Sequence, residues 1–350
     1  MRFSMRFTPW TLACLTASVG VLAICSRADA QNVRVGIVNS STDVPFFIAD
    51  AKGYFKEEGL SVELLPFDAG AKMIAFLGTG DLDVGGGAPS VALYNAAAQG
   101  VQIRIIADKA HHAAGLGHAA LMVRKDLIDS RKFTDFKDLK GLKVALVGVG
   151  SGDESVLNEA LKRGGLKWGD ANVVYLGFPQ HPPAFQNGAV DASLTSEPFW
   201  TVIKKQATAV AFARNGQIYP DQQSTVLMYG VGFTKNKPDL ARKFIRAYIR
   251  AARFYTDAIA DGSMSGSNAS EVVSILVKYS VTKDPEIHKA VIPPMIDPDG
   301  RLNVDSLRKD WQFFKDTGQI DGTVTVDSLL DTSFSDAAVA SMGRYTPKTR

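Results

Sequence analysis

Short apolar runs alternate with helix-like stretches along the chain from residue 31 to about residue 110. Runs such as VRVGIV (33–38) and SVELLPF (61–67) have the length and β-branched content of strands. Between them, VPFFIADAKGYFKEEG (44–59) has the spacing of a helix that ends at Gly59. The same alternation continues through a helix at 72–80, a strand at 81–86, a helix at 89–100 and a strand at 101–108. Strands joined by crossover helices predict a mostly parallel sheet with helices on both faces.

The pattern restarts near Ala119, which predicts a second α/β unit. Its expected strands are 119–124, 143–149, 172–178 and 191–196, and its expected helices are 136–141, 153–165, 182–188 and 197–207. Strand-like sequence returns at 224–238. The strongest helix pattern follows at 239–262, where apolar residues recur every three or four positions. We expect a loop at 263–270 and a mainly helical tail that includes a helix over 304–318.

The first thirty residues have the pattern of a secretory signal. Arg2 and Arg6 precede the apolar run TLACLTASVGVLAIC, which is short for a membrane span, and Ala28-Asp29-Ala30 offers small residues for cleavage. We therefore expect a mature chain that starts at Gln31 and is exported to the periplasm. A lipoprotein anchored at Cys25 is the alternative, but Ile24 is bulky where such signals have a small residue.

Composition and charge exclude some kinds of site and disfavour some kinds of partner. The 350 residues are 46% hydrophobic and 21% charged, which suits one large or two medium folded domains. Both cysteines, Cys14 and Cys25, lie in the predicted signal, so the mature chain is expected to lack disulfides, thiol-ligated zinc and thiol nucleophiles. Cleavage would lower the formal charge from +3 to +1, which does not favour binding to nucleic acid.

Several short motifs carry a resemblance to a known family. They are A-x-x-x-G-Y-F at 49–55, G-x-x-D-x-G at 80–85, FKDLKGLKVA at 136–145, FQNGAVDA at 185–192, SEPFW at 196–200 and NKPDLARKFIRAYIRA at 236–251. In this order, across 33–331, the chain resembles the periplasmic substrate-binding proteins of ABC importers. The group in question binds nitrate, sulfonates and taurine, and it also includes thiamine-pyrimidine-synthase relatives.

The resemblance implies the two-lobed periplasmic-binding-protein fold of type II. This is an α/β fold with mixed, mostly parallel sheets and a hinge of two crossing strands. Lobe 1 would comprise 31–117 plus 229–350, and lobe 2 would comprise 118–228. The resemblance further implies a monomer without a cofactor, which binds a small-molecule solute in the cleft between the lobes and delivers it to the membrane subunits of an ABC permease.

Ligands of open parallel sheets collect beyond the carboxyl ends of strands, so the strand-to-helix junctions are the candidate contacts. Two of them, 84–90 and 148–155, are rich in glycine and serine and could present backbone amides and hydroxyls. Each could equally be a tight turn, and the loop 39–45 could be only a helix cap. The expected ligand-binding residues at the five junctions are Asn39, Ser41, Thr42, Lys72, Gly87, Ala88, Ser90, Ser151, Gly152, Thr195 and Glu197.

Some of these candidates have a simpler interpretation. Lys72 could be a solvated lysine rather than an anion contact, and Glu197 could serve only the helix that follows it. If Glu197 faces the ligand, it favours an amine or a zwitterion over a bare anion. His111 and His112 could donate to a carboxylate or sulfonate, or could be exposed loop residues. We expect no metal site, because adjacent histidines do not point one way and no acidic partner has ligand spacing.

The sequence favours a small organic anion or zwitterion of the sulfonate, taurine or carboxylate class. None of the five junctions offers an arginine for a bidentate clamp, which makes nitrate the less favoured ligand. An enzyme of the thiamine-pyrimidine-synthase type is the alternative function, although those relatives use a cysteine-rich motif. Neither Gly-x-Ser-x-Gly nor His-Glu-x-x-His occurs in the sequence. The ligand-sensing half of a transcription regulator is disfavoured by the predicted export signal.

Overall fold

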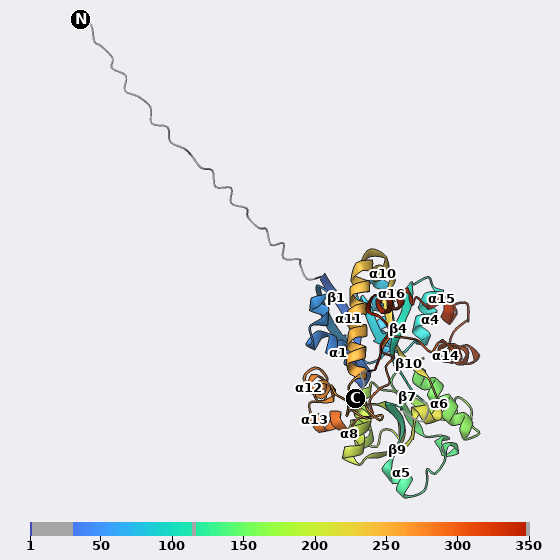
Figure 1. Cartoon of the computed structure of the whole chain (residues 1–350). Coiled ribbons are helices and arrows are strands. Elements are labelled where there is room, and N and C mark those ends of the chain that lie inside the picture. The colour runs from blue at the N-terminus through green and yellow to red at the C-terminus, as the bar shows by residue number, and fades with distance from the viewer. Residues whose placement is uncertain (2–30, 114–116, 348–350) are drawn as a thin grey trace.

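The computed structural model describes Met1 and residues 31–113 and 117–347, and the predicted signal segment lies outside them. The strands form two five-stranded sheets, each in its own lobe. In Figure 1 the lobe with β1, β4 and α11 lies above the lobe with β9, α5 and α6. No helix within the described residues is both long and apolar enough to cross a membrane.

The first sheet has the order β2-β1-β3-β10-β4. Strand β1 runs parallel to β2 and β3, whereas β10 runs antiparallel to both of its neighbours. The sheet is therefore mixed, with β10 alone opposing the other four strands. The strands are β1 (Gln31–Ile37), β2 (Leu60–Pro66), β3 (Val84–Gly87), β4 (Ile103–His111) and β10 (Gln223–Gly230).

Helices cover both faces of this sheet. Alternate residues of β10 separate the two cores: Leu227 and Tyr229 join the cluster with α1 and α11, and Val226 and Met228 join the cluster with α3 and α4. The helices are η1 (Ser41–Asp43), α1 (Val44–Ala51), α2 (Tyr54–Glu57), η2 (Gly70–Lys72), α3 (Met73–Thr79), α4 (Val91–Ala98), α10 (Val231–Asn236), α11 (Pro238–Thr256), α12 (Ala269–Tyr279), α13 (Pro285–Ala290), α14 (Val304–Asp316), α15 (Val326–Leu329) and α16 (Ser333–Met342).

The second sheet repeats this arrangement in the order β7-β6-β8-β5-β9, with β5 antiparallel to both neighbours. Its strands are β5 (Ala119–Arg124), β6 (Lys143–Leu146), β7 (Asn172–Tyr175), β8 (Ala192–Ser196) and β9 (Ala209–Arg214). Its helices are α5 (Lys125–Asp129), η3 (Phe136–Leu139), α6 (Gly152–Arg163), η4 (Phe178–Gln180), α7 (His181–Gln186), α8 (Phe199–Gln206) and α9 (Asn215–Ile218).

The chain passes from the first sheet to the second between β4 and β5, and it returns between β9 and β10. Strands β4 and β10 flank these crossings and pair with each other. All of β10 belongs to the first sheet, including residues that the sequence assigned to lobe 2. The lobe boundaries and the hinge stay predictions.

Several elements differ from the sequence expectation, and strand β9 was not among the expected strands. The helix predicted over 44–59 is divided into α1 and α2 at Gly53, whose φ of 73° is left-handed. The predicted strand over 224–238 becomes a helix, α10, from Val231 onward. Helix α11 ends at Thr256 rather than 262, because the chain turns there and packs the buried Ala258 outside the helix.

Candidate functional site

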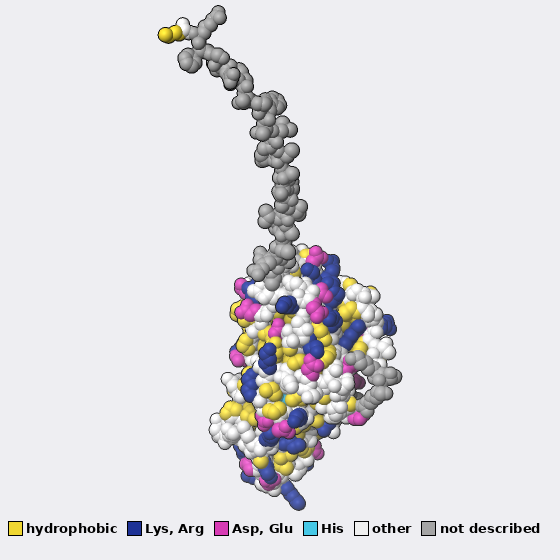
Figure 2. All heavy atoms as spheres, turned by 60° about the vertical axis from the view of Figure 1, so that its left-hand side comes forward, with side chains coloured by type: hydrophobic (Ala, Val, Ile, Leu, Met, Phe, Trp, Pro, Cys, Tyr) yellow, Lys and Arg dark blue, Asp and Glu magenta, His cyan; other side chains and the backbone are white. Residues whose placement is uncertain are grey.

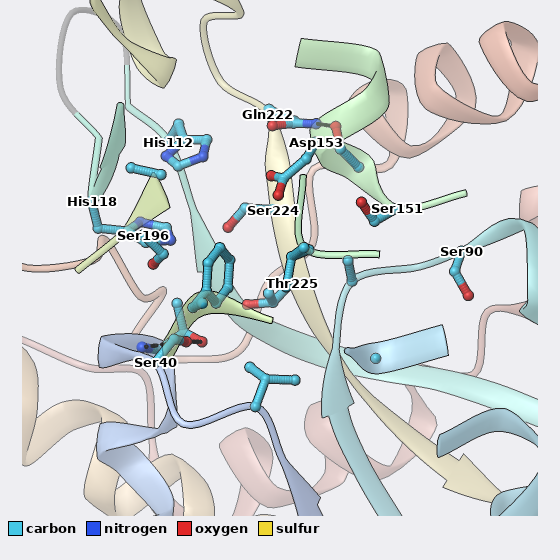
Figure 3. A pocket seen from close by; sticks show the side chains of 18 of the residues that line it. Ser40, Ser90, His112, His118, Ser151, Asp153, Ser196, Gln222, Ser224 and Thr225 are labelled. Atoms are coloured by element: carbon cyan, nitrogen blue, oxygen red, sulfur yellow. Dashed lines mark hydrogen bonds between the residues drawn. The ribbon is translucent and has the colours of Figure 1, made fainter. Parts of the chain in front are cut away.

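A cavity lies between the two lobes, and residues of both line it (Figure 3). Its volume of about 50 Å³ is several times the roughly 10–15 Å³ needed to hold one water, so it suits a small solute. The lining residues are Val38, Ser40, Thr42, Gly70, Ala71, Ala88, Ser90, His112, His118, Ala119, Val147, Ser151, Gly152, Asp153, Phe178, Ser196, Gln222, Ser224 and Thr225.

The cavity is built mainly from the carboxyl ends of strands and the helix starts that follow them. Ser40 follows β1, Ser90 follows β3, Ser151 follows β6 and Ser196 ends β8. Ser90 caps α4, since its Oγ accepts a hydrogen bond from the amide of Leu93. Unpaired amides and hydroxyls therefore converge on one space from both sheets.

The lobes touch each other beside the cavity. The amide of Val91 donates to the carbonyl of Gly150 at 2.9 Å, and the amide of Ser41 donates to the carbonyl of Glu197 at 2.9 Å. Each of these bonds joins an element of the first lobe to an element of the second. The conformation described is thus one in which the lobes are closed over the cavity.

Ser40 and Thr42 supply an oriented hydroxyl donor. Lys109 Nζ donates to Thr42 Oγ1 at 2.6 Å, and the hydroxyls of Thr42 and Ser40 share a hydrogen bond of 2.8 Å. Only one of the two hydroxyl hydrogens lies between these side chains, so the other remains available to a ligand. Lys109 itself is fully buried and is paired with Asp43 at 2.8 Å.

Two histidines form a neutral wall of the cavity. The rings of His112 and His118 stack with centroids 4.5 Å apart, and both side chains are buried. Burial lowers the pKa of His112 to about 3 and the pKa of His118 well below its usual value. The Nδ1 atom of each ring is buried and finds no hydrogen-bond partner within residues 31–113 and 117–347. At neutral pH these rings therefore provide hydrogen-bonding groups without charge.

Asp153 is the acidic group of the lining. It lies in the first turn of α6, and burial raises its pKa to about 7. Among the cavity residues that the structure describes, none is lysine or arginine. The cavity thus offers polar groups without a permanent positive charge.

The structure brings six of the predicted ligand contacts together in this cavity. Five come from three of the predicted junctions, and one comes from the segment between β4 and β5. They are Thr42, Ala88, Ser90, His112, Ser151 and Gly152. Their contact with a ligand stays a prediction.

The other candidates of the first lobe lie outside the lining. Asn39 takes a left-handed conformation with φ of 55°, and Ser41 is turned away from the cavity into a buried position. Gly87 packs on Gly70, since a Cβ at Gly87 would lie 2.7 Å from the Cα of Gly70. Lys72 is exposed, and its ammonium group pairs with Asp68.

Three further candidates serve packing and the closed interface. His111 pairs with Asp108 at 3.3 Å, and Thr195 Oγ1 bonds His181 Nδ1 at 2.8 Å. Glu197 is buried, and burial raises its pKa to about 7. Its Oε1 accepts from the amide of Ile292 at 3.1 Å, so this side chain joins the lobes instead of lining the cavity.

Some lining residues were not among the predicted contacts. Asp153 follows the N-cap residue Ser151 in the first turn of α6, a position where an acidic residue is typical of a helix start. His118 lies just before β5 and belongs to no predicted strand-to-helix junction. Gln222, Ser224 and Thr225 lie at the start of β10 and carry no motif, because only the docking of the second lobe places them at the cavity.

We expect Lys72→Gln to change the affinity for an anionic ligand by less than about twofold. The Lys72 side chain is 62% exposed and does not line the cavity, so its charge is screened by solvent. Calorimetric titration of the variant beside the wild type measures this. A tenfold loss of affinity would place Lys72 at the binding site after all.

Over residues 31–113 and 117–347, no group of three or more histidine, cysteine or acidic side chains is placed to hold a metal ion. The face shown in Figure 2 mixes basic and acidic side chains, with neither sign dominating it.

Comparisons with known proteins agree with this architecture. The NMT1-like family matches residues 26–276. The chain is 27% identical to the taurine-binding periplasmic protein of Escherichia coli K12 over 65% of this chain and 68% of that protein. It is 26% identical to a putative aliphatic sulfonates-binding protein of Bacillus subtilis 168 over 92% and 95%. The solved nitrate-binding protein of Synechocystis PCC 6803 superposes with a TM-score of 0.73 at 15% identity, covering 90% of each chain.

Proposed function

Because the chain belongs to the NMT1-like family, we propose that it is an extracytoplasmic solute receptor of an ABC importer. It binds a small organic anion or zwitterion of the sulfonate, taurine or carboxylate class between its lobes and delivers it to a permease. A nitrate receptor is the alternative. The fold is the two-lobed α/β fold of periplasmic binding proteins.

One observation carries this proposal: a small cavity at the strand ends is lined by both lobes and is covered where they touch. A solute in this position contacts both lobes only when they are closed. Its binding energy therefore stabilises the closed form over the open form. Ligand capture and conformational change are then one equilibrium, and a permease that recognises the closed form receives loaded protein.

The lining supports an acidic ligand held by neutral donors. Hydroxyls of Ser40, Ser90 and Ser151 and the amides at the start of α6 converge on the cavity. Apolar groups such as Val38 and Phe178 complete the wall. This mixture favours an acid group on a short organic chain over a bare inorganic anion.

An exported receptor also agrees with the start of the fold. Strand β1 begins at Gln31, the first residue expected after cleavage of the signal. Two relatives are named as a taurine-binding periplasmic protein and a putative aliphatic sulfonates-binding protein. The cysteine-rich motif of the pyrimidine synthases has no counterpart, since Cys14 and Cys25 are the only cysteines of the sequence.

A thermal-shift screen of the chain from Gln31 tests the function. We expect taurine, ethanesulfonate or a short carboxylate to raise Tm, because ligand at a hundred times Kd adds about 2.7 kcal/mol to the unfolding free energy. Nitrate and pyrimidines serve as the comparison set. A shift with pyrimidines and none with any sulfonate or carboxylate would contradict the proposed ligand class.

A further inference from the structure

We propose that Asp153 binds the acid group of the ligand as a carboxylic acid, donating a hydrogen bond from Oδ2, so that an anionic solute is bound together with one proton. This assignment rests on the proposed function and specifies the chemistry of the same site.

The position of the carboxyl group is the first argument. Asp153 lines the cavity, and Figure 3 shows its carboxyl group directed into the pocket, close to Gln222 and Ser224. Its Oδ2 is fully buried and has no hydrogen-bond partner among the residues that the structure describes, while the carboxyl group accepts a bond from the amide of Val147. A buried oxygen without a partner is costly. A ligand atom in the cavity can supply that partner.

The charges around the carboxyl group are the second argument. His112 and His118 face the same cavity as neutral rings, and burial holds the pKa of each low. Lys109, the buried cation behind Thr42, is already paired with Asp43.

Further acidic groups lie close to Asp153. Glu154 follows Asp153 in the chain and raises the pKa of its carboxyl group. Asp310 bonds Gln222 at 3.2 Å from the other side. Burial raises the pKa of Asp310 to about 7, and a carboxyl group supplies no positive charge in either protonation state.

An ionised Asp153 would therefore place a second negative charge beside the ligand without a cation between them. Two like charges in a partly desolvated site repel each other strongly. Protonation removes this repulsion and turns the unpaired oxygen into a donor. A hydrogen bond from a neutral acid to an anion is short and strong, and an apolar site is known to keep a carboxylic acid neutral for this purpose.

Binding of a proton together with the ligand predicts that the affinity for an anionic ligand falls as pH rises. Burial raises the pKa of Asp153 to about 7, so below that pH the free protein already carries the proton. Above it, each binding event must take a proton from solvent, and affinity falls by up to tenfold per pH unit. Ethanesulfonate is a suitable probe because it stays a monoanion and has no amine.

The test compares the wild type with Asp153→Asn, whose amide imitates the protonated acid and cannot ionise. We expect the wild type to lose on the order of thirtyfold in ethanesulfonate affinity from about pH 6 to about pH 8.5, and the variant to lose less than about threefold. Glu197 and Asp310 contribute equally to both proteins, so the difference in slope reports Asp153 alone. Asp239→Asn, on an exposed part of α11, is the matched control and should follow the wild type.

Calorimetry of the wild type in buffers of different ionisation enthalpy gives a second measurement that needs no variant. We expect uptake of close to one proton per ethanesulfonate at about pH 8. Zero uptake, or equal pH slopes in the two proteins, would overturn the assignment. A wild type without a pH slope for ethanesulfonate, together with a variant that loses taurine, would also overturn it, because Asp153 would then be ionised and would pair with the amine. If the wild type binds neither of these sulfonates nor a short carboxylate at about pH 6, the proposed function fails and the assignment fails with it.

Discussion

Lys109→Met is expected to lower the unfolding free energy by roughly 3–5 kcal/mol. Lys109 and Asp43 are fully buried and form an ion pair of 2.8 Å. Removing the lysine leaves the carboxylate in the core, where the amides of Val38 and Ser40 are its remaining donors. Urea unfolding of the variant and the wild type, followed by circular dichroism, measures the loss.

Two variants complete this experiment. Lys125→Met removes an exposed lysine paired with Asp129 and should cost less than about 1 kcal/mol. The double variant Lys109→Met/Asp43→Leu removes both buried charges and should recover part of the lost stability. If Lys109→Met lowers the unfolding free energy by less than about 1 kcal/mol, the buried Asp43 carboxylate does not need this cation for its stability.

Ser151→Trp is expected to weaken ligand binding by more than about a hundredfold while the protein stays folded. Ser151 is 4% exposed and lines a cavity of about 50 Å³, so an indole ring fits there only if the lobes separate. Ser90→Trp, on the other lobe, should have the same effect. Titration with ethanesulfonate or taurine measures the affinity, and small-angle scattering measures the expected rise in radius of gyration.

Ser130→Trp is the control for this change, because Ser130 lies at the exposed end of α5 in the same lobe. Ser130→Trp should leave the ligand affinity and the radius of gyration unchanged. Unchanged affinity in both Ser90→Trp and Ser151→Trp would place the binding site outside the cavity.

The lobes could be predicted from sequence because their strands are strongly apolar and recur with helices between them. The expected restart near Ala119 coincides with the start of β5, and the expected return near Thr225 falls within β10. Local pattern sufficed for these strands, but not for β9, which was not among the expected strands. The glycine and serine turns before α4 and α6 were also found, and both reach the cavity.

The rest depended on tertiary contacts that no local pattern contains. Lys109 follows the predicted strand 101–108 and lies within β4, and nothing in its sequence neighbourhood indicates a partner as distant as Asp43. Glu197 lies at a predicted junction, but the docking of Ile292 turns its side chain into the interface. Lys72 precedes a helix whose rotation is set by the burial of Met73 and Leu77, and this rotation directs the lysine to solvent.

The place of β10 has a consequence for how the chain matures. This strand fills the position between β3 and β4, yet it is made after the whole of the second sheet. During synthesis from the N-terminus, β1 to β4 are made before β10, so their sheet lacks the strand between β3 and β4. Strands β5 to β9 need no later strand to complete their sheet. The inserted lobe can therefore acquire its native pairing first, and its compact form then brings β10 back to the unfinished sheet.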